Sequence, residues 1–227
     1  MPLAFAQRLS AVSPSVTLAM NARAADLRAK GADVFAFGVG EPDFDPPAHV
    51  LAAAKAAIDA GASKYTAVTG IAPLKKAICD ASARSRGFSP KPEQVTVTVG
   101  AKHALFNLAI ALFEPGDEVI IPKPFWVSYP DMVRLADGVP VIVETSAADG
   151  WVPDAREIRK AISPRTKAVI INSPSNPTGA VLTLERRRVR APWHRLPRDL
   201  ELRGAQRIDE HDENATIRQH TRGVRIP

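Results

Sequence analysis

The 227-residue sequence is poor in features that would place it outside the cell or in a membrane. It has one cysteine, Cys79, so no disulfide can form within the chain, and a lone thiol is typical of a reducing compartment. No apolar run approaches the roughly 18 residues of a membrane-spanning helix. The start, MPLAFAQRLSAVSPSV, lacks the regions of a secretory signal. We therefore predict a cytoplasmic protein with no membrane partner and a structural, buried Cys79.

Lysine is absent after Lys167, although the chain has a net charge of +6. From Leu184 onward the basic residues are arginines and histidines, whereas the earlier part mixes lysine with arginine and is close to neutral. A basic excess at one end describes that end and not the whole protein. Acidic residues interrupt the tail 184–227, and it has no DNA-binding motif. We predict that it is disordered and does not bind nucleic acid; the alternative is a noncatalytic protein that binds nucleic acid or another anion through this tail.

Apolar runs alternate with helical periodicity over the rest of the chain. Strands are predicted at 33–40, 94–100, 117–122, 139–145 and 167–174, and helices at 15–31, 48–61, 71–87, 101–113, 126–137 and 154–163. Pro73 suits the first turn of its helix, whereas Pro130 is predicted to interrupt its helix. The alternation is typical of an α/β fold with a mainly parallel sheet and flanking helices, in which ligands bind at the carboxyl ends of the strands.

Two of these strand ends carry residues suited to a flat anionic ligand. Gly100 ends a predicted strand just before a helix, whose free N–H groups favour an anion, and Lys102 adds positive charge. An ordinary turn with a glycine explains the segment equally well. Trp126 follows the next strand and could stack on a planar ligand, although packing in the core is the commoner role of a tryptophan.

The segment GVGEPDFDPP offers a backbone contact at Gly40 and three acidic side chains. Glu41, Asp43 and Asp45 invite a metal or paired-carboxylate interpretation, but no histidine or further acid lies at ligand spacing. We therefore predict solvated loop acids and no metal. Tyr65, in SKYTAVTG, is a surface tyrosine on this reasoning.

The turn INSPSNPTGA is unusually constrained. Asn176 precedes Pro177, which restricts its backbone and aims its amide. An amide held in this way could donate to a ligand oxygen. An asparagine that merely caps its own turn would need far less constraint.

Taken in order, GEPDFDPP, KYTAVTGI, VTVGAKHALFNLA, PGDEVIIPKPFWVSYPDMV and NSPSNPTGAV resemble the class I pyridoxal-phosphate-dependent aminotransferases, and bacterial aspartate aminotransferases in particular. The resemblance covers about residues 9–183. It implies part of the large α/β domain of a fold-type I enzyme. We divide the chain into an N-terminal arm, helix and substrate loop (1–45), a partial cofactor domain (46–183) and a tail outside the family pattern (184–227).

The resemblance also implies roles for matching residues. The cofactor is pyridoxal 5′-phosphate, and the implied contacts are Gly100, Ala101 and Lys102 with its phosphate, Trp126 with its ring, Asn176 with its phenolic oxygen, and Tyr65 with the phosphate of a neighbouring subunit. Gly40, Trp126 and Asn176 would contact the substrate. His103 departs from the pattern, because relatives often have glutamine there.

The implied reaction moves an amino group from an amino acid such as aspartate to a 2-oxo acid. A lyase or synthase of the same fold is an alternative, as is a noncatalytic binding protein. The family's Schiff-base lysine, pyridine-binding aspartate and carboxylate-binding arginine follow the NPTG turn, and nothing after Leu184 matches them. We interpret the tail as the product of a frameshift and expect this chain to be inactive. The resemblance also implies a homodimer.

Overall fold

The computed structural model describes residues 5–12, 14, 16–35, 37–38, 40 and 44–182. The chain divides into two compact units, Ser13–Val68 and a larger unit that joins Met1–Val12 to Thr69–Pro227. The predicted division into arm, cofactor domain and tail stays a prediction, and the tail 184–227 lies outside the described residues.

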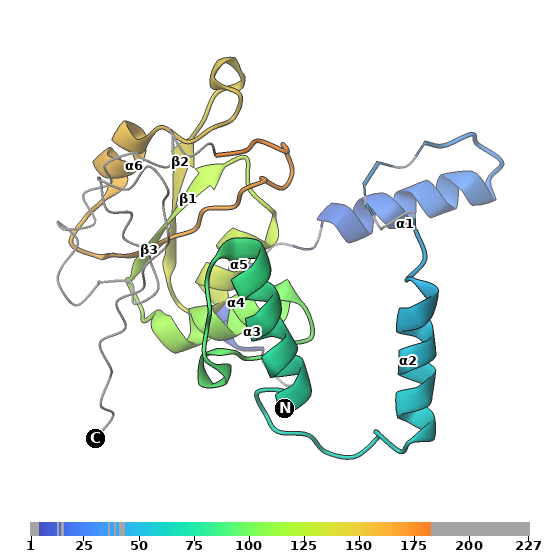
Figure 1. The fold of residues 1–227 in the computed structure, drawn as a ribbon. Helices are drawn as coiled ribbons and strands as arrows, with labels where there is room; N and C mark the ends of the chain where they lie inside the picture. The colour runs from blue at the N-terminus through green and yellow to red at the C-terminus, as the bar shows by residue number, and fades with distance from the viewer. Residues whose placement is uncertain are drawn as a thin grey trace. The chain divides into compact units, whose positions relative to one another are not determined.

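A three-stranded parallel sheet forms the centre of the larger unit (Figure 1). Its strands are β1 (Glu118–Lys123), β2 (Val139–Glu144) and β3 (Thr166–Val169), in the order β2-β1-β3. β1 pairs in parallel with both neighbours. Five of its six residues are buried, and Lys123 is exposed. An unbroken apolar run suits such a strand because both of its faces are covered. The strands predicted at 117–122, 139–145 and 167–174 are confirmed.

The strand order reverses direction at β1. The chain leaves β1 through α5 (Ser128–Leu135) to reach β2, and then returns through α6 (Ala155–Ala161) past β1 to β3. Right-handed crossovers that run in opposite directions place their helices on opposite faces of a sheet. α5 and α6 accordingly lie on different sides of the strands (Figure 1). The crevice at the carboxyl ends of β1 and β3 is therefore the expected ligand position of this topology.

Side chains from β1 and α5 form the core. Val119 and Ile121 point to the same face of β1 and pack with Tyr129 and Val133 of α5. Leu105 of α4 (Ala101–Leu112) adds to this cluster. The cluster fixes α4 and α5 against the strand, and so places the N-termini of both helices near the carboxyl edge.

The structure corrects the predictions for Pro130 and Cys79. Pro130 is the third residue of α5, where no helical partner exists for its missing N–H, so it does not interrupt the helix. Cys79 lies in α3 (Ala72–Arg86) and is only half-buried. Pro73 lies in the first turn of α3 as predicted, and Gly87 ends that helix with a φ of +62°.

Neither segment 94–100 nor the described part of segment 33–40 forms a strand, so both predictions were wrong. A strand needs a neighbour for its backbone groups. The backbone bond that ties residues 95–99 to a distant segment runs from the Val97 N–H to the Thr69 carbonyl, at 3.0 Å. Helix η2 (Pro92–Gln94) precedes this extended segment.

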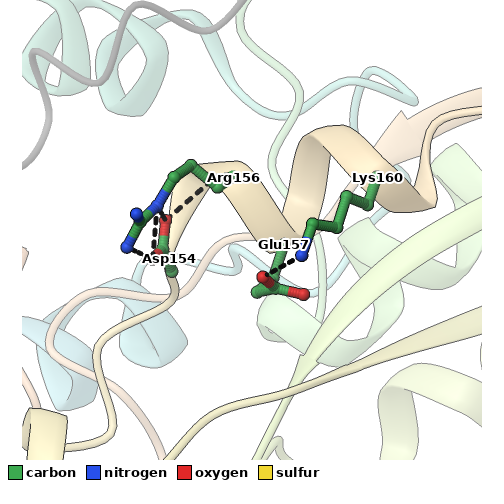
Figure 2. A network of polar contacts seen from close by, with 4 residues as sticks. All are labelled: Asp154, Arg156, Glu157 and Lys160. Carbon is green, nitrogen blue, oxygen red and sulfur yellow. Dashed lines mark hydrogen bonds and ion pairs between the residues drawn. The ribbon is translucent and has the colours of Figure 1, made fainter.

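Polar side chains fix the start of α6 (Figure 2). The Asp154 carboxylate accepts from the Arg156 N–H at 2.7 Å, and its other oxygen pairs with the Arg156 guanidinium at 2.7 Å. These bonds to Arg156 hold the pKa of Asp154 below its ordinary value. Glu157 pairs with Lys160 at 2.7 Å on the same helix. Two further short helices of the larger unit are η1 (Gln7–Ala11) and η3 (Ala147–Asp149).

The unit of residues 13–68 contains α1 (Val16–Ala29) and α2 (Ala48–Asp59). Both agree with the predicted helices, and none of the residues of α2 is buried. Among the described residues of the whole chain, no helix is both long and apolar enough to cross a membrane.

Candidate functional site

A pocket opens at the carboxyl edge of the sheet, where the strand order reverses. The end of β1 (Ile121–Lys123) and the segment after β3 (Ile170–Asn172) form two of its walls. Its other lining residues are Pro124, Phe125, Tyr129, Thr145, Trp151, Val152, Pro153, Ser175, Asn176, Ala180, Val181 and Leu182. The position agrees with the crevice that the topology predicts for a ligand.

Trp126 is half-buried and lies two residues before the start of α5, and two neighbours hold its ring. Tyr129 meets it edge to face, with the ring centroids 5.4 Å apart and the planes at 86°. Lys102 reaches over from α4 and places its Nζ 4.9 Å from the centre of the Trp126 ring. Such a cation–π contact stabilises an ammonium group on an aromatic face. The structure therefore brings together Lys102 and Trp126, which the sequence placed at the starts of two separate predicted helices.

Tyr129 connects this pair with the pocket. Its ring contacts Trp126, and Tyr129 lines the same pocket as Asn176. The side chain is almost fully buried, and this burial raises the pKa of its phenol. Sequence reasoning did not single out Tyr129. The predicted helix 126–137 placed Tyr129 three residues after Trp126, and this spacing was the available signal, although α5 itself begins only at Ser128.

The N-terminus of α4 is built from Gly100 and Ala101. Gly100 has a φ of +103° and gives the helix no side-chain cap. A Cβ added at Gly100 would meet nothing within 4 Å, so the space beside it is open. The amide groups of the first turn thus have no capping side chain at the position that favours an anion.

Asn176 lies on an exposed turn that is closed by its own hydrogen bonds. The Gly179 N–H donates to the Ser175 carbonyl at 2.7 Å, and the Ser175 N–H donates to the Ala180 carbonyl at 2.9 Å. The Leu182 N–H donates to the Ser173 hydroxyl at 2.9 Å. Asn176 is exposed at the rim of the pocket. The other asparagine that lines the pocket, Asn172, was missed because nothing in the sequence distinguishes it from a turn residue.

The remaining predicted site residues belong to the unit of residues 13–68. Gly40 and Tyr65 are both exposed there, and Tyr65 is fully so. The structure therefore groups five of the predicted residues in one unit, namely Gly100, Ala101, Lys102, Trp126 and Asn176. Glu41 and Asp43 lie outside the described residues. Within the described part of the chain, no cluster of three metal-binding side chains occurs.

The chain belongs to the class I and II aminotransferase family: the model of that family, described as "Aminotransferase class I and II", matches residues 32–188. It is 52% identical over 179 residues to the aspartate/prephenate aminotransferase of Thermus thermophilus. It is 50% identical over 180 residues to the aspartate aminotransferase of Geobacillus stearothermophilus. Each match covers 79% of this chain and 46% of the relative, so the chain spans about half the length of these curated relatives.

Solved structures agree with this assignment. The aspartate aminotransferase of Thermus thermophilus with maleate superimposes with a TM-score of 0.78 at 50% identity, over 81% of this chain and 48% of that one. An aspartate aminotransferase from Rhizobium meliloti gives a TM-score of 0.76 at 45% identity, over 80% and 45%. The predicted resemblance and the predicted fold class, part of the large domain of a fold-type I enzyme, are confirmed.

Proposed function

We propose that this chain carries the cofactor-binding half of an aminotransferase site and holds pyridoxal 5′-phosphate by its phosphate and ring. The observation that carries the proposal is the contact between Lys102 and Trp126 beside the N-terminus of α4. It joins an anion site, a cation and a flat aromatic surface within one unit. Family membership supports the same assignment.

The donor set fits the chemistry of this cofactor. The amides of Ala101 and Lys102 and the Lys102 ammonium suit a phosphate group. The Trp126 ring suits the face of a pyridine ring. The amide of Asn176 can donate to a phenolic oxygen. Pyridoxal phosphate, when bound, supplies the electron sink through which an amino acid loses its α-proton.

Each of these residues would then bind or orient the cofactor and would not itself transfer a proton. Gly100 would let the ligand approach the backbone of the helix N-terminus, since no side chain stands there. Tyr129 would keep the Trp126 ring in place through its edge-to-face contact. The resemblance implies that the backbone of Gly40 contacts the substrate. It also implies that Tyr65 contacts the cofactor phosphate bound by a neighbouring subunit. An amino acid such as aspartate and a 2-oxo acid are the substrates of the reaction that the resemblance implies, and this chain, which has no lysine after Lys167, is proposed to bind the cofactor without turnover.

We test the proposal by titrating the 227-residue chain with pyridoxal 5′-phosphate and with inorganic phosphate in a calorimeter. Lys102→Met should weaken the binding of both ligands about ten- to a hundredfold, because it removes a charge-assisted hydrogen bond. Lys76→Met is the matched control, since Lys76 is an exposed lysine paired with Asp80 on α3. Equal affinity of the wild-type chain and Lys102→Met for both ligands would contradict the proposal.

A further inference from the structure

Two side-chain hydrogen bonds hold the segment that leads into α4. The Thr98 hydroxyl donates to the Gly100 carbonyl at 3.0 Å. The Val99 N–H donates to Nδ1 of His103 at 3.4 Å, across the first turn of the helix. His103 therefore acts as an acceptor, and its neutral ring must carry the proton on Nε2.

Packing contributes little at Val99 and Gly100, although Val95 earlier in the same segment is buried. Val99 is 90% exposed and Gly100 is also exposed, so no apolar burial fixes the direction of the chain at this point. Gly100 in addition has a φ of +103°, and a glycine can change from this conformation to many others at little energetic cost. Without these bonds the Val99 N–H would hydrogen-bond to water instead, and the backbone just before α4 would have no fixed orientation.

We propose that His103 is a positioning residue that holds the Val99 amide and so orients the first amides of α4 and the adjacent Lys102 toward a phosphate group. The inference rests on the proposed function of this site. A segment that is already ordered loses less conformational freedom when a ligand binds, which improves affinity. His103 acts through the backbone and does not contact the ligand.

Three variants test whether His103 acts as a hydrogen-bond acceptor or only fills space. Asparagine places Oδ1 close to the position of the histidine Nδ1, so His103→Asn keeps an acceptor, whereas His103→Ala removes it. His49→Ala, on the exposed surface of α2, is the control for the loss of a histidine. Binding of inorganic phosphate and of pyridoxal 5′-phosphate to the full 227-residue chain is the readout. Long-range ¹⁵N–¹H correlations of the His103 ring in the wild-type chain report its tautomer independently of any variant.

We expect the Nε2–H tautomer in the wild-type chain. His103→Ala should weaken phosphate binding about three- to tenfold, the range of a lost neutral hydrogen bond. His103→Asn and His49→Ala should bind within about twofold of the wild-type chain. A ring protonated only on Nδ1, or a His103→Asn variant as weak as His103→Ala, overturns the inference.

The two proposals fail in different ways. If the wild-type chain binds neither probe, the proposed function fails, and the role of His103 fails with it. If the wild-type chain binds both probes and His103→Ala binds them equally well, only the role of His103 is overturned. A His103→Ala variant that does not fold leaves the tautomer and the His103→Asn affinity to decide the matter.

Discussion

Lys102 and Asn176, which both lie in the larger unit of the chain, would contact opposite ends of the proposed ligand. Lys102 rests on the Trp126 ring beside the amides of α4, where a phosphate is favoured. Asn176 lies at the rim of the pocket and offers a neutral amide. Tyr129 contacts Trp126 and lines the pocket, so one buried side chain connects the two positions. These different chemistries allow the two ends to be tested separately.

Asn176→Ala should weaken the binding of pyridoxal 5′-phosphate about two- to tenfold, because one neutral hydrogen bond is removed. The same variant should bind inorganic phosphate as the wild-type chain does, since the amide is proposed to meet the ring oxygen and not the phosphate. Calorimetric titration of the full chain with each ligand checks this. A parallel loss of affinity for both ligands would show that Asn176 acts on the phosphate or on the fold.

At the scale of elements, the short strand β3 depends on a polar contact with β1. Glu118 is buried at the start of β1 and accepts hydrogen bonds from Nε and Nη2 of Arg165 at 2.9 and 2.6 Å. The Ser163 hydroxyl donates to the other carboxylate oxygen. The Glu118 N–H also donates to the Arg165 carbonyl at 2.8 Å. This cluster ties the start of β3 to the start of β1, at the edge of the sheet opposite the pocket, where the register of the pair shifts between Glu118 and Val119.

The same cluster makes stability depend on pH. The hydrogen bonds from Ser163 and Arg165 hold the pKa of Glu118 below its ordinary value of 4.5. The folded chain thus binds this proton less readily than the unfolded chain, so the stabilisation is present above about pH 4.5 and is lost as the pH falls through the lowered pKa. Glu118→Gln should lower the free energy of unfolding at neutral pH, and its difference from the wild-type chain should shrink below pH 4.5.

Urea denaturation of the full chain at a series of pH values measures this difference. Glu157→Gln is the control, because Glu157 forms an exposed ion pair with Lys160 on α6, and such pairs contribute little to stability. A gap between Glu118→Gln and the wild-type chain that stays constant from neutral to acidic pH would rule out the titration of Glu118 as its cause.

For the whole molecule, the proposed ligand site and the lysine content lead to different expectations. The residues suited to phosphate, ring and phenolic oxygen are all present, and the chain matches about half the length of its curated relatives. The resemblance puts the lysine that bonds the cofactor after the NPTG turn, and these 227 residues contain no lysine after Lys167. Binding of the cofactor without turnover is therefore the behaviour we propose for this chain.

We expect the 227-residue chain to show no transamination of aspartate, and borohydride treatment with pyridoxal 5′-phosphate to trap no adduct on a single defined lysine. Peptide mass spectrometry after reduction checks the second point, and a full-length aspartate aminotransferase treated in the same way is the positive control. An adduct confined to one lysine of this chain, accompanied by activity, would contradict the expectation.

Local patterns were enough to predict six helices and the three paired strands, because hydrophobic periodicity and capping residues act within a few positions of the chain. They failed for the segments 33–40 and 94–100, since strand formation depends on a neighbour that periodicity does not reveal. They also predicted wrongly that Pro130 interrupts its helix, because the predicted helix began at Trp126, whereas α5 begins at Ser128 and Pro130 is its third residue.

The sequence by itself determined the family and the identity of the residues suited to a cofactor, because these depend on ordered motifs and on the chemistry of single side chains. Only the tertiary structure decided that Lys102 rests on Trp126, that Tyr129 joins this pair to the pocket, and that His103 holds the Val99 amide. The physical reason is that most of these contacts join separate elements, which come together only when α4 and α5 pack on the same face of β1.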